Sequence, residues 1–122
     1  MSNPSLDKFG ELLMKRVRDK AIGDWERFIS GEMKGATAER VQQQIVSLTP
    51  EQRDTLCNLI PLIVDTTLHH LLFTAEQERS LQLIIDNPGE SAAHNLRDIS
   101  DGLSGELYGK HGWIARFSKK SK

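Results

Sequence analysis

Three short phrases of the sequence have the composition of helix starts, and they constrain the fold more than any other feature. Each begins with a potential side-chain cap and carries Glu or Gln three residues later: Thr49–Gln52, Thr74–Gln77 and Asn87–Glu90. The cap oxygen accepts from first-turn N–H groups that lack a partner inside the helix, and the Glu or Gln reaches back to the cap. Proline follows two of the caps, where a helix tolerates it best. The sequence therefore predicts an all-α fold, a bundle of about five helices.

Length and composition are those of one ordinary globular domain. The chain has 122 residues, of which 38% are hydrophobic and 27% charged, so it can bury a core and does not resemble a disordered protein. We expect a single helical domain over residues 1–118 and a basic, mobile tail over 119–122. The formal net charge of -1 provides no global attraction to nucleic acid or anionic lipid.

Several features favour a cytoplasmic protein without a membrane-spanning segment. Met1 to Asp7 lack the basic-then-apolar order of a secretory signal, and uninterrupted apolar runs such as Leu59 to Val64 are too short to cross a bilayer. Cys57 is the only cysteine, so the chain can form no internal disulfide. Because Cys57 lies among apolar residues, we interpret it as a buried small hydrophobe rather than a nucleophile.

The first half of the chain has the apolar spacing of two helices. The first begins after Ser5, ends near Gly23 and continues in a short extension that Asp24 caps; its apolar face is Leu6, Phe9, Leu13 and Val17, followed by Trp25, Phe28 and Ile29. A loop covers Gly31 to Gly35. Thr37 then caps a second helix, whose core positions are Val41, Ile45 and Leu48.

The third helix is predicted to begin at Pro50 and to contain a proline. Its apolar positions are Leu56, Leu59 or Ile60, Ile63, Leu68, Leu71 and Leu72. Pro61 removes a backbone hydrogen bond and clashes with the preceding turn, at a cost of about 3 kcal/mol in a regular helix. We therefore expect a kink or a break between Asn58 and Pro61.

Two further helices are predicted after it. The fourth runs from Ala75 to about Ile85, although a strand over Leu81 to Ile85 is an alternative because that run is short, apolar and partly β-branched. The fifth runs from Pro88 to about Tyr108; its apolar positions are Ala92, Leu96, Ile99, Leu103 and Leu107. Gly102 and Gly105 weaken its end.

The C-terminal segment has a different pattern, which favours a short extended element. A turn over Gly109 to Gly112 is followed by apolar residues that alternate with others from Trp113 to Phe117, as in a strand. Aromatic residues and arginine often anchor interfaces, so we identify a candidate partner-binding group: Tyr108, Trp113, Ile114, Arg116 and Phe117. The alternative is that Trp113 and Phe117 close the open end of the bundle.

Charge is segregated along the C-terminal third. Residues 76–106 contain seven acidic and two basic residues, whereas residues 107–122 contain five basic and none acidic. The tail could dock on its own chain, exchange between two subunits to make a homodimer, or bind another protein or nucleic acid. Nothing in the tail resembles a base-reading helix, so nucleic acid is the least favoured partner.

One pair of residues suggests chemistry. On a helix, Asp65 and His69 share a face and could ligate a metal ion together with a distant His94 or His111, although the favoured interpretation of His69 is a hydrogen-bonded residue at the core boundary. The sequence contains no cysteine pair, no His-Glu-x-x-His motif, no nucleophile-elbow spacing around Ser104 and no phosphate-binding glycine loop.

These observations predict a small, soluble, non-catalytic protein-interaction module, such as a regulatory, inhibitor or immunity-type partner, that is either monomeric or homodimeric. No cofactor and no small-molecule substrate are expected. The alternative is a metal-dependent enzyme that uses Asp65, His69 and a distant histidine.

Overall fold

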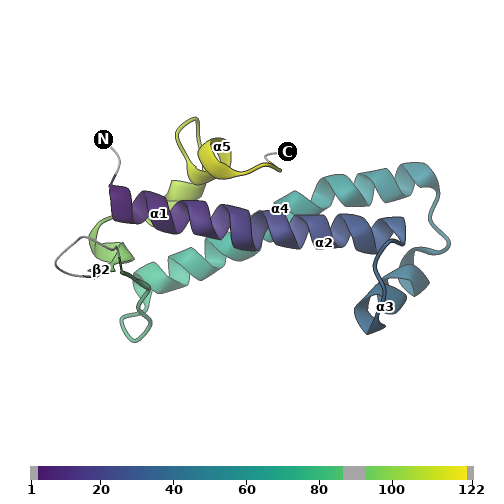
Figure 1. The fold of residues 1–122 in the computed structure, drawn as a ribbon, viewed down its shortest axis with the longest axis horizontal. Helices are drawn as coiled ribbons and strands as arrows, with labels where there is room; N and C mark the ends of the chain where they lie inside the picture. The colour runs from purple at the N-terminus through teal and green to yellow at the C-terminus, as the bar shows by residue number, and fades with distance from the viewer. Residues whose placement is uncertain (1–2, 87–92, 121–122) are drawn as a thin grey trace.

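The computed structural model describes residues 3–86 and 93–120, and this part of the chain is mostly helical (Figure 1). Residues 4–77 form three helical rods, with the bounds α1 Pro4–Leu13, a π-helical turn Met14–Arg18, α2 Asp19–Ser30, α3 Ala36–Ile45 and α4 Pro50–Gln77. The rest consists of short elements: strands β1 Ile84–Ile85 and β2 His94–Asn95, the 3₁₀ turns Leu96–Asp98 and Ser104–Leu107, and helix α5 Trp113–Phe117. The expected all-α class is therefore confirmed in its broad form.

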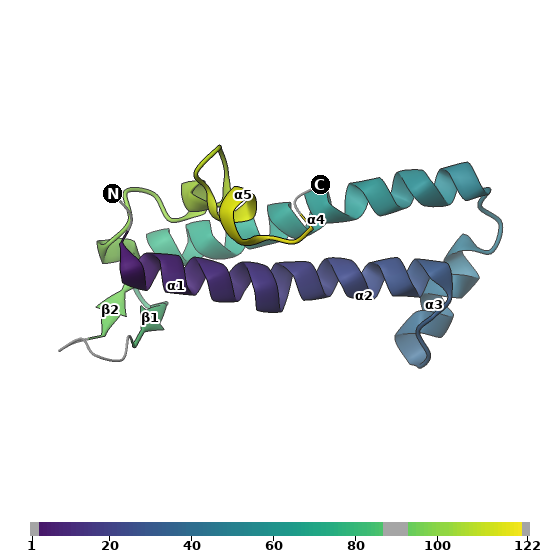
Figure 2. The ribbon, with the colours of Figure 1, turned by 45° about the horizontal axis from the view of Figure 1, so that its top comes forward.

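The architecture is a long helical hairpin with a small C-terminal cover. α1, the π turn and α2 form one rod, α4 returns antiparallel to it, and α3 joins them at one end (Figure 2). α2 contacts both α3 and α4, whereas α1 contacts α5 and the 3₁₀ turn Ser104–Leu107 contacts α4. The C-terminal segment therefore completes the packing between α1 and the second half of α4.

Two apolar clusters fill the interior. One joins α1, the C-terminal half of α4 and the C-terminal segment; its most buried members include Met14, Leu72, Leu96, Leu107 and Trp113. The other joins α2, α3 and the first half of α4 through Ile22, Ile29, Val41, Ile45 and Ile60. Val64 packs against both clusters, so α4 is the element that unites them.

The first rod differs from the prediction in its length and in its buried face. The helix does not end at Gly23, which is a buried position within α2. It ends at Gly31, which adopts a left-handed conformation with φ of 85°. The π turn adds a residue to one helical turn and so shifts the register of the face. Met14 and Arg18 are buried as a result, whereas Val17, predicted in the core, is 46% exposed.

Caps explain where the next helices begin. α3 follows Gly35 rather than Thr37, and Val41 and Ile45 are buried as predicted. α4 begins as predicted: Thr49 Oγ1 accepts from the Gln52 N–H at 3.2 Å, and the Gln52 side chain accepts from the Thr49 N–H at 2.9 Å. This reciprocal pair is a local interaction, which is why the sequence shows it directly.

α4 is one continuous helix of 28 residues, so the predicted break at Pro61 is wrong. The prediction of a separate fourth helix from Ala75 is also wrong. α4 continues past Thr74 to Gln77, and Ala75 is buried on the same face as Leu68 and Leu72. The alternative strand is correct in part, since Ile84 and Ile85 form β1 and pair antiparallel with Asn95 and His94. A kink at Pro61 stays a prediction.

The predicted fifth helix is absent from the described residues between 93 and 108, and its proposed cap at Asn87 lies outside the described part of the chain. A strand and two 3₁₀ turns stand in its place. Arg97 accounts for part of this difference, because its guanidinium donates to the carbonyl oxygens of Ala75, Glu78 and Arg79 at the end of α4. These carbonyls lack helical partners, and the contact holds the returning chain across the helix end.

The residues predicted as a C-terminal strand form α5 instead. Trp113 is fully buried and lies against Phe9 in an edge-to-face arrangement, with ring centroids 5.7 Å apart. A Cβ atom at Gly10 would overlap the Trp113 ring, so the glycine makes room for the indole. The helical turn of α5 places Trp113 in the core. The alternation of apolar and other residues from Trp113 to Phe117 had predicted a strand with one apolar face.

Candidate functional site

Asp65, which the sequence predicted to bind a metal ion together with His69, forms an ion pair with Arg18 instead. The Arg18 Nε donates to Asp65 Oδ1 at 2.6 Å and its Nη2 donates to Oδ2 at 3.2 Å, so both carboxylate oxygens are directed toward Arg18 rather than His69. Within residues 3–86 and 93–120, no group of three or more His, Cys, Asp or Glu side chains is arranged to hold a metal ion. His111 lines a different, polar cleft with Asp101 and Glu106.

His69 lies in an aromatic environment. Its ring stacks parallel to Phe73 and is 6.1 Å from the ring of Tyr108, while Nδ1 is buried without a hydrogen-bond partner in the described structure. Partial burial, followed by the negative charge of Asp65, raises the pKa of the Tyr108 hydroxyl. His69 is thus a residue at the core boundary, as the second interpretation of the sequence proposed, though without the predicted hydrogen bond at Nδ1.

Arg18 also anchors the end of the described chain. Its Nη1 donates to Ser118 Oγ at 2.8 Å and to the Lys120 carbonyl at 2.5 Å, and its side chain is only 1% exposed. Ser118 Oγ and the Lys119 N–H donate to Asp19, and Lys120 Nζ donates to Glu26 at 2.8 Å. Residues 118–120 therefore dock on α2 and the π turn of their own chain, and not on the described part of the acidic 76–106 segment.

The predicted aromatic interface group is divided between core and surface. Trp113 is wholly internal, and Ile114 and Phe117 are half-buried against the same core. Arg116 donates to Asp7 at 3.0 Å and stacks on Phe117, with 4.7 Å from its guanidinium carbon to the ring centroid. Tyr108 is 47% exposed. Trp113, Ile114 and Phe117 therefore contribute to the core, and partner binding by the exposed members of the group stays a prediction.

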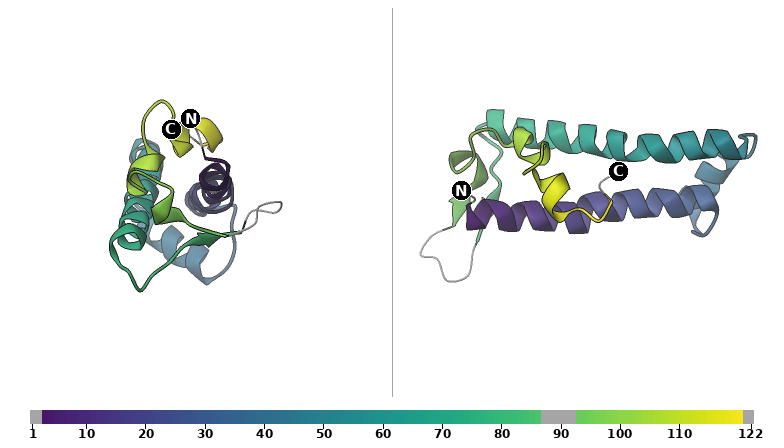
Figure 3. Two further views of the ribbon diagram at one scale, coloured as in Figure 1. Left: turned by 90° about the vertical axis from the view of Figure 1, so that its left-hand side faces the viewer. Right: turned by 90° about the horizontal axis from the view of Figure 1, so that it is seen from above.

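An exposed apolar feature of the described residues lies elsewhere, on the side of α4 that faces away from the hairpin. We call it the outer face of α4 and define it by five exposed residues: Leu59, Leu62, Ile63, Thr66 and Phe73. The exposed fractions of the Leu and Ile side chains are 45%, 61% and 59%, and Phe73 is 46% exposed. The right-hand view of Figure 3 shows α4 along one edge of the molecule.

The outer face is uncharged, and its hydroxyl groups are already bonded. Between Asp54 and Glu76 the only Asp, Glu, Lys or Arg is Asp65, which Arg18 holds on the inner side. Thr66 Oγ1 donates to the Leu62 carbonyl and Thr67 Oγ1 to the Ile63 carbonyl, both at 2.9 Å. These threonines can be covered without losing a hydrogen bond to water, because the bond is made within the helix. A shallow hollow of about 340 Å³ lies among them.

In the described residues, α4 is the one helix whose length and apolar composition would allow it to cross a membrane, and 22% of its most apolar stretch is buried. Uninterrupted apolar runs in the sequence do not reveal this property, because Asn58, Asp65 and the histidines divide the run. A bilayer is a poor environment for α4 as packed. α2 lies against it and exposes charged side chains, among them the Asp24–Arg27 pair and the Lys120–Glu26 pair.

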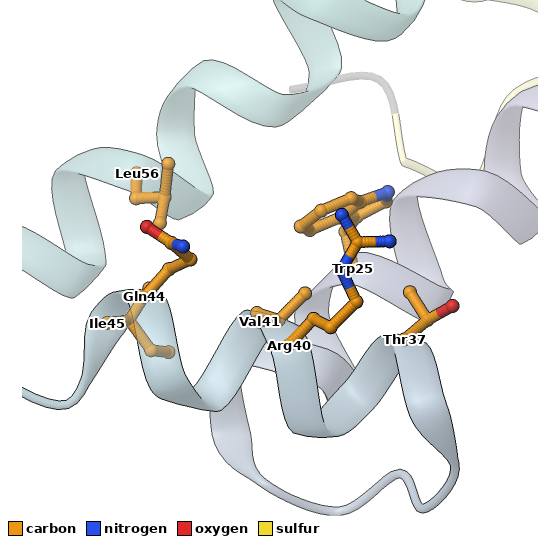
Figure 4. A pocket seen from close by; sticks show the side chains of 7 residues that line it. All are labelled: Trp25, Thr37, Arg40, Val41, Gln44, Ile45 and Leu56. Carbon is orange, nitrogen blue, oxygen red and sulfur yellow. The ribbon is translucent and has the colours of Figure 1, made fainter.

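A second feature is a pocket of about 430 Å³ between α2, α3 and α4 (Figure 4). Trp25, Val41, Ile45 and Leu56 supply its apolar surfaces. Three polar side chains from α3, those of Thr37, Arg40 and Gln44, also line it. Such a pocket depends on three elements distant in sequence, so no local motif could have revealed it.

The surroundings of Cys57, the only thiol of the chain, are those of a packing residue rather than a nucleophile. Cys57 is half-buried and packs against the cluster that joins α2, α3 and α4. Burial raises the pKa of the thiol, and the negative charges of Asp54 and Glu26 raise it further. Since the thiolate is the nucleophile, these surroundings disfavour covalent chemistry at Cys57 near neutral pH.

No protein-family profile, curated protein sequence or solved structure matches the chain. Its function must therefore be argued from its own surfaces.

Proposed function

We propose that this protein is a non-catalytic interaction module that assembles through the outer face of α4, and that the partner on this face is a second copy of the chain. The observation that supports the proposal is an exposed, largely apolar face that carries no Asp, Glu, Lys or Arg on an otherwise charged molecule. Contiguous apolar surface of this kind marks interaction sites in soluble proteins.

The spacing of the face suits a second helix of the same kind. Leu59, Leu62, Thr66, the exposed His70 and Phe73 follow one another at intervals of three, four, four and three residues, which is the seam spacing that allows two helices to pack side by side. The face spans about 21 Å of helix at 1.5 Å per residue. Two hairpins joined in this way would form a four-helix arrangement.

A second copy is favoured because an uncharged face offers no charge pattern to select a different protein. In a two-fold dimer the same patch meets itself, so an apolar face is complementary to its own copy by construction. The contact buries eight half-exposed large side chains, four from each copy, at about 1 kcal/mol each. The cost of association is about 4–15 kcal/mol, so we expect a weak, concentration-dependent dimer rather than an obligate one.

Sedimentation equilibrium from about 5 to about 500 µM protein tests the proposal. The wild-type chain should pass from monomer to dimer, and Leu62→Lys should weaken the dimer at least about tenfold, because it places two like charges in an apolar contact. Val46→Lys is the matched control: Val46 is 74% exposed but lies after α3, away from the face.

A wild-type chain that stays monomeric over this range would contradict the proposal. So would equal weakening by both lysine substitutions. Flotation of the wild-type protein with phosphatidylcholine vesicles, without self-association, would assign the face to a membrane instead. Circular dichroism should show that both variants keep the wild-type helix content, since both sites are exposed.

The metal-dependent enzyme is less well supported, because the carboxylate on which it depended is engaged by Arg18.

A further inference from the structure

We infer that the pocket between α2, α3 and α4 is a binding site for a compact amphipathic acid, a ligand with an aromatic or branched aliphatic body and one carboxylate. The pocket shares no lining residue with the outer face of α4, so this inference does not depend on the dimer.

The shape and the lining of the pocket argue for the apolar body. Its volume of about 430 Å³ lies within the range typical of small-molecule sites, about 300–1,000 Å³. Val41 and Ile45 are buried side chains of α3, and Leu56 belongs to α4. The exposed Trp25 ring, which packs edge-to-face on Phe28, adds a flat aromatic surface from α2. Surfaces from three elements thus converge, as Figure 4 shows.

Arg40 argues for the carboxylate. Three other arginines have carboxylate partners: Arg18 has Asp65, Arg27 has Asp24, and Arg116 has Asp7. The Arg40 side chain makes no hydrogen bond or ion pair with the described part of the chain, and it extends along the pocket on the same helix as Val41 and Gln44. A guanidinium presents paired donors that match the two oxygens of a carboxylate.

The two requirements together define the ligand class. A fully apolar ligand would leave the Arg40 donors unused, and an inorganic anion would leave the apolar surfaces exposed to water. An acid of the size of 3-phenylpropanoate carries both parts: a ring for the apolar lining and a carboxylate for Arg40. The same chemistry occurs at the C-terminal phenylalanine of a peptide, so the experiment includes both sources.

Isothermal titration with 3-phenylpropanoate, monitored in parallel by fluorescence of the exposed Trp25, tests the inference. We expect a dissociation constant of about 0.1–1 mM, the range open to so small a ligand. The neutral amide, 3-phenylpropanamide, should bind about tenfold more weakly. Arg40→Gln should remove the difference between acid and amide, whereas Arg16→Gln, at an exposed arginine of the π turn, should preserve it.

Three results would overturn the inference: no binding of the acid at about 5 mM, equal affinities of acid and amide for the wild-type protein, or equal effects of the two arginine substitutions. Tighter binding of the peptide Gly-Gly-Phe than of the free acid would reassign the site to peptide termini. Because Arg40 is exposed on α3, its substitution leaves the core intact. Unchanged self-association of Arg40→Gln in sedimentation would show that the ligand site and the proposed dimer are independent.

Discussion

At the scale of single residues, the contact between Gly10 and Trp113 shows how a side chain distant in sequence decides which residue a helical position can accept. Alanine is a better helix former than glycine by about 1 kcal/mol, so α1 by itself would gain from Gly10→Ala. The added methyl group, however, would overlap the buried indole ring. Overpacking of a core costs about 1–3 kcal/mol, which exceeds the helical gain.

We therefore expect Gly10→Ala to lower the free energy of unfolding by about 1–2 kcal/mol in urea titrations. Gly23→Ala is the matched control, because Gly23 is also within a helix and its added Cβ would meet neighbours at an ordinary 3.7 Å. That variant should be unchanged or more stable by up to about 1 kcal/mol. Stabilisation by both substitutions would show that Trp113 is not packed on Gly10.

At the scale of elements, α4 explains why the helix count differs from the prediction. Two signals in the sequence, Pro61 and the phrase at Thr74, indicated helix boundaries, yet the helix contains both. Each signal reflects only the local stability of one helical turn. The buried face from Ile60 through Leu68 to Ala75 spans four turns and packs against two clusters, so the gain from burial exceeds the local cost of a proline.

Pro61→Ala measures this balance. Removing proline from a helix interior gains about 3 kcal/mol, and the loss of two buried methylene groups costs about 1.6 kcal/mol. We expect the variant to be more stable by about 1 kcal/mol, measured by urea unfolding. A loss of stability would mean that the core requires the shape proline imposes on α4, and would favour the kink that the sequence predicted.

At the scale of the whole molecule, Arg18 links three distant parts of the chain. It lies on the π turn, pairs with Asp65 on α4 and receives the end of the chain at Ser118 and Lys120. A buried guanidinium needs acceptors for its donors, because an unsatisfied one costs about 1–3 kcal/mol. The tail supplies two of those acceptors and so acts as part of the fold.

Deleting residues 118–122 should therefore lower the free energy of unfolding by about 1–3 kcal/mol and reduce the midpoint in urea. Deleting only residues 121 and 122, which leaves the contacts of Ser118 and Lys120 in place, is the control and should have little effect. Equal stability of the two shortened chains would show that Arg18 does not depend on the tail.

Features that depend on neighbouring residues follow from the amino-acid order alone: the cap at Thr49, the helical class, and buried positions such as Val41, Ile45, Leu68 and Leu72. The tertiary structure decided the features that depend on distant partners. Arg97 holds the end of α4, Trp113 fits over Gly10, and Arg18 takes the carboxylate expected at a metal site. It also decided which apolar residues of α4 face outward, because a 28-residue helix carries apolar side chains on several sides and only packing selects the side to be covered. Caps and periodicity act within a turn or two, whereas burial and ion pairing depend on the full three-dimensional arrangement.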